Sequence, residues 1–169
     1  MSTRGAVAIR QDDGTWKGVY NRYDSYPTGL GRDSFRIIDS TGNLEEFAGD
    51  LLRYDTWENF VDQDLDIGNR MEHIKSNKNP DPLYLEWVYV VDVENKKLEV
   101  LAHEDVTGKV ETRDISQEEK PKKVDGGWHY GHCIFKHKKV AEYDLSKGEP
   151  DWQKLEEKIY KINEEKVTS

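Results

Sequence analysis

The chain has 169 residues, of which 35% are hydrophobic and 35% charged, and its net charge is −9. This length suits one domain with one core, and five Trp, nine Tyr and four Phe exclude a disordered chain. The negative charge disfavours nucleic acids and anionic membranes as partners. No apolar run reaches the ~20 residues of a membrane span. Because Cys133 is the only cysteine, an internal disulfide is impossible. The apolar run at residues 6–9 is also too short for a signal peptide, so we expect a cytoplasmic protein.

The first elements expected along the chain are two short strands, at residues 5–10 and 16–20. Asp13 and Gly14 lie between them, and an Asp-Gly pair is a strong hairpin signal because glycine adopts a positive φ without steric cost. Residues 21–32 are rich in turn-forming residues, which predicts a loop ordered by the packing of Tyr23 and Tyr26 on the sheet.

Helices are expected next. Residues 33–39 fit either a helix or a strand, whereas residues 43–53 place apolar side chains on one helical stripe, with Asn43 as the N-cap. Thr56 is expected to cap a short second helix with its apolar side chains, Trp57, Phe60 and Val61, pointing inward. A weaker helical pattern covers residues 69–75.

The sequence of the second half of the chain predicts mainly strands. After a breaker at residues 77–82, residues 84–93 are apolar on both faces, which indicates a central strand. A turn at residues 94–96 leads into a strand at 97–101, residues 109–115 can add a third strand, and residues 131–144 form one long strand or a second hairpin. A final helix follows Pro150, with an apolar face formed by Trp152, Leu155, Ile159 and Ile162.

This order predicts an α+β fold with a largely antiparallel sheet, built from an N-terminal hairpin and a central hairpin and covered by helices. A layered α/β/β/α sandwich is one arrangement that the order allows. We expect one domain over residues 1–163 and a frayed tail at residues 164–169. The sequence leaves the oligomeric state open.

Three histidines, His129, His132 and His137, lie within nine residues and are the candidate ligands of a metal-dependent activity, with His103 as a further ligand. A strand over this segment places His132 on one face and Cys133 with His137 on the other, so the ligands do not converge. The two-Cys and two-His spacings of known zinc sites are missing, so we expect no metal and no cofactor. Cys133 as a nucleophile would need a base from another strand, since His137 lies ~13 Å along its own strand.

Two weaker patterns involve charged residues. Residues 62–68 resemble the start of a calcium loop, but the required glycine and glutamate each lie one place off, which favours an acidic helix end. A basic cluster, Lys120, Lys122 and Lys123, reads as a solvated loop, and we do not expect nucleic-acid binding.

The N-terminus carries an enzymatic alternative. Removal of Met1 would expose the amine of Ser2 at the head of a strand, with Thr3 following. N-terminal-nucleophile hydrolases attack an amide with such a hydroxyl and use the α-amine as the base. Ser2 or Thr3 would then be the nucleophile, and Arg4 would steer an anionic substrate.

The opening Thr3-Arg4-Gly5 and the stretch Val19-Tyr20-Asn21-Arg22-Tyr23-Asp24-Ser25-Tyr26-Pro27-Thr28-Gly29-Leu30-Gly31 resemble a group of small, uncharacterised phage and bacterial proteins. Residues 86–92 are similar to the central strand of that group. The resemblance implies kinship without an activity, but it directs attention to the loop, because loops on rigid scaffolds commonly hold sites. The candidate binding residues are Asn21, Tyr23, Asp24, Ser25 and Tyr26. The alternative is that Asn21 and Asp24 satisfy backbone groups in a turn while the tyrosines pack.

We therefore expect a non-catalytic binding or accessory module that acts through a protein partner, with its exposed aromatic residues as anchors. The alternatives are the N-terminal-nucleophile hydrolase and the metal-dependent activity at the histidine segment.

Overall fold

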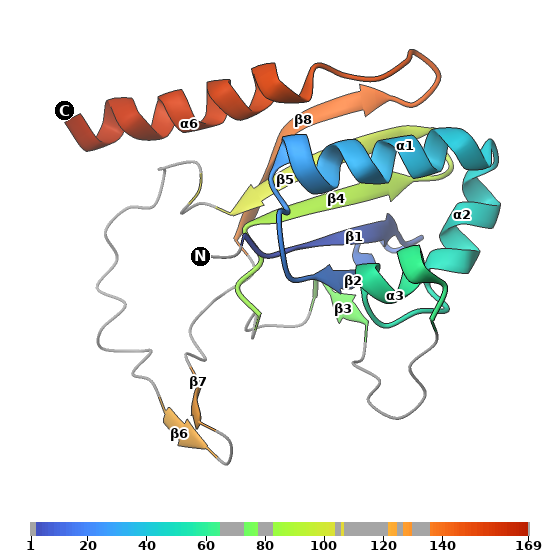
Figure 1. The fold of residues 1–169 in the computed structure, drawn as a ribbon, viewed down its shortest axis with the longest axis horizontal. Helices are drawn as coiled ribbons and strands as arrows, with labels where there is room; N and C mark the ends of the chain where they lie inside the picture. Colours follow the sequence, from blue (N-terminus) through green and yellow to red (C-terminus); the bar gives the residue numbers. More distant parts are fainter. Residues whose placement is uncertain are drawn as a thin grey trace.

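A computed structural model describes residues 3–64, 73–77, 83–103, 106, 122–124, 127–129 and 136–168, with the backbone alone at 122–124, 127–129 and 161–168. Its centre is a six-stranded sheet of strand order β3-β2-β1-β4-β5-β8 (Figure 1). The strands are β1 Gly5–Arg10, β2 Trp16–Asn21, β3 Ile74–Lys75, β4 Trp87–Asp92, β5 Lys97–His103 and β8 His137–Asp144. A separate two-stranded ribbon joins β6 Lys122–Val124 and β7 Gly127–His129.

The sheet is antiparallel except at one pair of strands. β1 and β2 form the predicted hairpin with Arg10 opposite Trp16, and Gly14 in its turn has a φ of 86°. β4 and β5 form the predicted central hairpin. The two hairpins meet where β4 runs parallel to β1. The α+β class with a mainly antiparallel sheet is confirmed.

Helices follow the first hairpin and end the chain. They are the π-helical turn η1 Pro27–Gly31 and the α-helices α1 Arg32–Thr41, α2 Leu44–Leu51, α3 Trp57–Asp62 and α6 Trp152–Thr168. Both predicted N-caps are present: the side chain of Asn43 accepts from Glu46 N at 3.1 Å, and that of Thr56 accepts from Asn59 N at 3.1 Å. Among the described residues, no helix combines the length and the apolar character needed to cross a membrane.

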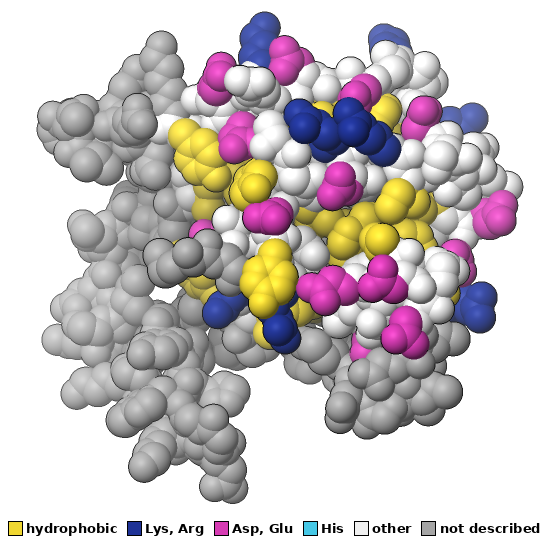
Figure 2. All heavy atoms as spheres, in the orientation of Figure 1, with side chains coloured by type: hydrophobic (Ala, Val, Ile, Leu, Met, Phe, Trp, Pro, Cys, Tyr) yellow, Lys and Arg dark blue, Asp and Glu magenta, His cyan; other side chains and the backbone are white. Residues whose placement is uncertain are grey.

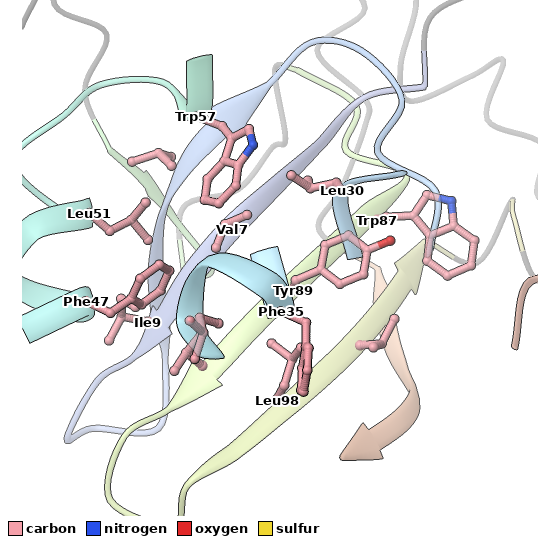
Figure 3. Close-up of a cluster of buried hydrophobic side chains, with 14 of the residues drawn as sticks. Val7, Ile9, Leu30, Phe35, Phe47, Leu51, Trp57, Trp87, Tyr89 and Leu98 are labelled. Atoms are coloured by element: carbon pink, nitrogen blue, oxygen red, sulfur yellow. The ribbon is translucent and has the colours of Figure 1, made fainter. Parts of the chain in front are cut away.

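The main core lies between one face of the sheet and the described helices α1, α2, α3 and α6. Figure 3 shows part of it, with Phe35 of α1, Phe47 and Leu51 of α2 and Trp57 of α3 against the strands. Alternate residues of the strands point into it, and Trp87 and Tyr89 of β4 are fully buried. The helices contribute rings that meet edge to face, as Phe35 of α1 and Trp152 of α6 do at 6.2 Å. This packing fixes α1, α3 and α6 relative to the sheet.

The opposite face of the sheet carries a second, smaller cluster. Trp16 and Tyr20 of β2 lie there with the small side chains of β1, Ala6 and Ala8, and Arg10 forms an ion pair with Glu99. No described helix belongs to this cluster. The described residues therefore form one main sheet with helices on one side, rather than the two stacked sheets of an α/β/β/α sandwich.

Several elements differ from the sequence-based expectation. Residues 27–31 are helical rather than a loop, and residues 33–39 belong to α1. Ile74–Lys75 is a strand paired with β2, not the end of a helix. Val61 is 48% exposed instead of pointing inward. The strand expected at 109–115 and the histidine segment at 130–135 lie outside the described residues. Helix α6 is described to Thr168, and the fraying expected at residues 164–169 stays a prediction.

Candidate functional site

The loop that follows β2 is held against the sheet by buried hydrogen bonds. Ser25 is fully buried; its backbone N donates to Thr3 O at 3.1 Å, and its carbonyl accepts from Tyr89 Oη at 2.6 Å. Burial raises the pKa of the Tyr89 hydroxyl well above its ordinary value, so this group stays a donor at neutral pH. A Cβ atom added at Gly5 would lie 2.6 Å from Ser25 Cβ, which shows how closely the loop approaches β1.

Two of the predicted binding residues shape this loop from inside. Asn21 Nδ2 donates to Tyr23 O at 2.5 Å and to Ser25 Oγ at 2.9 Å, and Ser25 Oγ donates to Asn21 O at 3.4 Å. Asn21 and Ser25 are both buried. Their polar groups are engaged within the loop, so they position it rather than face a ligand.

The other three predicted residues lie on the outside of the loop. Tyr23 is 54% exposed, and the Arg22 guanidinium lies 5.8 Å from the centre of its ring. Tyr26 Oη donates to Asp24 Oδ1 at 3.2 Å, and this hydrogen bond raises the pKa of Tyr26. We call residues Arg22, Tyr23, Asp24, Ser25 and Tyr26 the tyrosine loop.

The tyrosine loop lies next to α3. A backbone bridge joins Tyr20, at the end of β2, to Thr56, the residue before α3. The pKa of Arg22 is raised, chiefly by a hydrogen bond to Tyr23 and also by the negative charge of Glu58 on α3. The start of α3 therefore lies beside the end of β2, where the tyrosine loop begins.

A groove runs between α1 and α3. Its hollow has a volume of about 350 Å³ and is lined by Asp33, Arg36, Ile37, Trp57, Glu58, Val61 and Asp62. We call these seven residues the α1–α3 groove. Figure 2 shows the helical side of the molecule, where apolar areas are bordered by acidic side chains. Trp57 contributes a nearly buried indole, while Val61 stays about half exposed.

A second hollow of about 470 Å³ lies at the other end of α1, between the α1–α2 turn, the β4–β5 turn and the turn after β8. Its apolar lining includes Ile38 and Leu145, and its rim includes Asp39, Glu45 and Lys96. Neither this hollow nor the α1–α3 groove includes a residue of the tyrosine loop.

The residues of the hydrolase alternative are only partly described. Met1 and Ser2 lie outside the described residues. The carbonyl of Thr3 accepts the hydrogen bond from Ser25, and Arg4 Nη1 donates to Leu83 O at 3.4 Å. The N-terminal-nucleophile alternative stays a prediction.

Of the histidines, His137 on β8 lies beside His103 on β5, with ring centres 5.3 Å apart. His137 Nε2 lies 2.6 Å from the carbonyl oxygen of Leu85, and burial lowers the pKa of His137 to about 4. His129 is described by its backbone in β7, and His132 and Cys133 lie outside the described residues. Across the described part of the chain, no three His, Cys, Asp or Glu side chains come together as a metal site would require.

The α1–α3 groove is the feature that the sequence-based reasoning missed. A usable signal was present in the short helix capped by Thr56. Trp57 and Phe60 fill its inward stripe, so Val61 falls at the edge of that stripe, next to the acidic Glu58 and Asp62.

Comparison of the chain with protein-family models, with curated proteins and with solved structures finds no match. The resemblance carried by residues 3–5, 19–31 and 86–92 stays a prediction.

Proposed function

We propose that this protein is a non-catalytic binding module that engages a protein partner through the tyrosine loop and the neighbouring surface of α3. The observation that carries the proposal is the exposure of two large apolar side chains, Tyr23 at 54% and Val61 at 48%, on segments fixed by the core. Aromatic side chains are enriched among the anchors of protein interfaces, and a fixed segment presents such a side chain to a partner at low entropic cost.

Rigidity supports the proposal because a preorganised surface loses little conformational entropy on binding. The tyrosine loop is held by the bonds from Tyr89 and to Thr3, and α3 is held by Trp57 and Phe60, whose rings lie 5.2 Å apart in the core. Tyrosine is also a residue that commonly anchors interfaces, because its ring buries much area while its hydroxyl stays hydrated.

Site-specific photocrosslinking in the native host cell tests the proposal. A photoreactive phenylalanine analogue would replace Tyr23, Val61 or, as the control, Lys138. Lys138 is exposed on β8, at the sheet edge opposite the one formed by β2 and β3. We expect positions 23 and 61 to crosslink to the same protein and position 138 not to.

The affinity of that partner for the purified protein is the second measurement. Tyr23→Ala should weaken binding by about tenfold or more, as expected for an aromatic anchor. Crosslinks that are equal at all three positions, or an unchanged affinity of Tyr23→Ala, would contradict the proposal.

A further inference from the structure

The floor of the α1–α3 groove is apolar and held in place from below. Trp57 is 5% exposed, and its ring packs on Phe60, which in turn contacts Phe47 at 5.7 Å between ring centres. Ile37 of α1 and Val61 of α3 form the two walls. An apolar side chain that enters from solvent would therefore contact three apolar residues whose backbone is already fixed.

The rim of the groove is acidic. Asp33, Glu58 and Asp62 supply three carboxylates, and Arg36 is the one basic residue of the lining. The Arg36 guanidinium already donates to Glu149 Oε1 at 2.9 Å, so its charge is balanced from outside the groove. The described lining thus carries three carboxylates against one cation that is already paired elsewhere, and this net negative rim attracts cations and repels anions at neutral pH.

The dimensions of the groove suit a side chain better than a whole small molecule. Its volume of about 350 Å³ lies near the lower end of the ~300–1,000 Å³ that ligand pockets occupy. It is open along the exposed flank of α3, where Val61 is about half exposed. A partner chain could pass over the rim while one of its side chains fills the floor.

We propose that the α1–α3 groove receives an apolar side chain from a partner segment that carries lysine or arginine next to it. This inference rests on the proposed function and specifies the chemistry of the partner. The apolar side chain provides burial against Trp57, Ile37 and Val61, and the flanking cations pair with the carboxylates of the rim. An acidic segment is repelled by the same carboxylates, and so are the phosphates of nucleic acids.

A peptide titration followed by NMR tests this inference. The probe is a soluble synthetic peptide with one Leu between flanking Lys residues, added to protein labelled at the Ile, Leu and Val methyl groups. We expect saturable shifts at the methyls of Ile37 and Val61. Replacing the Leu by Ala should weaken binding by about tenfold or more, and replacing each Lys by Glu should abolish it.

Variants of the protein separate the contribution of the rim charges to peptide binding from the contribution of the shape of the groove. Glu58→Lys should weaken the Lys peptide and improve binding of the Glu peptide, and Val61→Asp should prevent entry of the Leu. The matched control is Glu46→Lys on α2, an exposed charge reversal outside the groove, which should leave both affinities within about twofold. Circular dichroism checks that each variant is folded.

The outcomes distinguish this inference from the proposed function. If positions 23 and 61 crosslink to one partner but the peptide shifts no groove methyl, the inference is overturned and the proposed function stands. Equal binding of the Lys and Glu peptides also overturns it. Groove shifts that depend on Leu and Lys and are lost in Val61→Asp support it.

Discussion

At the scale of single residues, the side chains in and next to the tyrosine loop have two different roles, to shape the loop or to face solvent, and the sequence alone does not show which residue has which role. Asn21 and Ser25 are buried, and the hydrogen bonds of their side chains join them to each other and to Tyr23. Tyr23 is exposed and makes its close ring contact with Arg22. The buried pair therefore sets the shape, and the exposed ring is the group available to a partner.

We expect the hydrogen bond from the Tyr89 hydroxyl to be the main polar interaction between this loop and the sheet. Tyr89→Phe leaves the buried carbonyl of Ser25 without its 2.6 Å donor, which should lower the free energy of unfolding by about 1–2 kcal/mol. Urea denaturation at neutral pH measures this loss. Tyr23→Phe removes the same group from an exposed ring and should change stability by less than about 0.5 kcal/mol. Equal losses in the two variants would contradict the role given to Tyr89.

At the scale of elements, the helices beside the groove are short and depend on the core. α3 has six residues, too few to be stable alone in water. Its position depends on the cap at Thr56 and on the packing of Trp57 and Phe60. The local signals for α2 and α3 were readable because caps and apolar stripes act within one turn. The prediction that Val61 points inward is wrong. Helical periodicity shows which side of α3 faces the core, but it does not show how far the core extends around the helix.

Alanine substitutions at two glycines, Gly49 and Gly5, compare the effect of helix propensity on stability with the effect of close packing. Gly49 lies inside α2 with no heavy atom within 4 Å of an added Cβ. Gly49→Ala should therefore raise the free energy of unfolding by up to about 1 kcal/mol through helix propensity. At Gly5 the added Cβ would lie 2.6 Å from Trp87 O and from Ser25 Cβ, so Gly5→Ala should lower stability by about 1–3 kcal/mol.

Thermal and urea unfolding of both glycine variants give the comparison. The loss in Gly5→Ala should be accompanied by changed NMR shifts in the tyrosine loop, because the loop must move to admit the methyl group. Wild-type stability for Gly5→Ala would show that the loop is not packed against β1 as described.

At the scale of the whole molecule, β8 closes the sheet opposite the first hairpin, and His137 connects it to the chain segment before β4. Its ring contacts Leu85 O and His103, and His103 in turn lies 5.0 Å from the ring of Tyr84. Burial is the main cause of the lowered pKa of His137, and the nearby His103 adds to it.

This pKa predicts a loss of stability in mild acid. The pKa of His137 is about 4 in the folded protein against 6.5 in an unfolded chain. Between these values the unfolded chain binds a proton that the folded protein does not, so stability should fall as pH decreases from 6.5 to 4, by about 2–3 kcal/mol in total. Urea denaturation across this range measures it, with His137→Gln as the comparison. The difference between the two curves should change over this window, and parallel curves would contradict the assignment.

Local patterns in the chain were enough to predict the hairpin at Asp13-Gly14, the capped helices at Asn43 and Thr56, the central strand and the final amphipathic helix. Each depends on residues a few positions apart, whose conformational preferences act without the rest of the chain. Three features became visible only in the folded chain: β4 pairs in parallel with β1, residues 74–75 join the sheet, and α1 and α3 leave an acidic groove with Val61 exposed. These features join segments far apart in the chain, and their geometry is set by how the helices pack on the shared core, which no local pattern records.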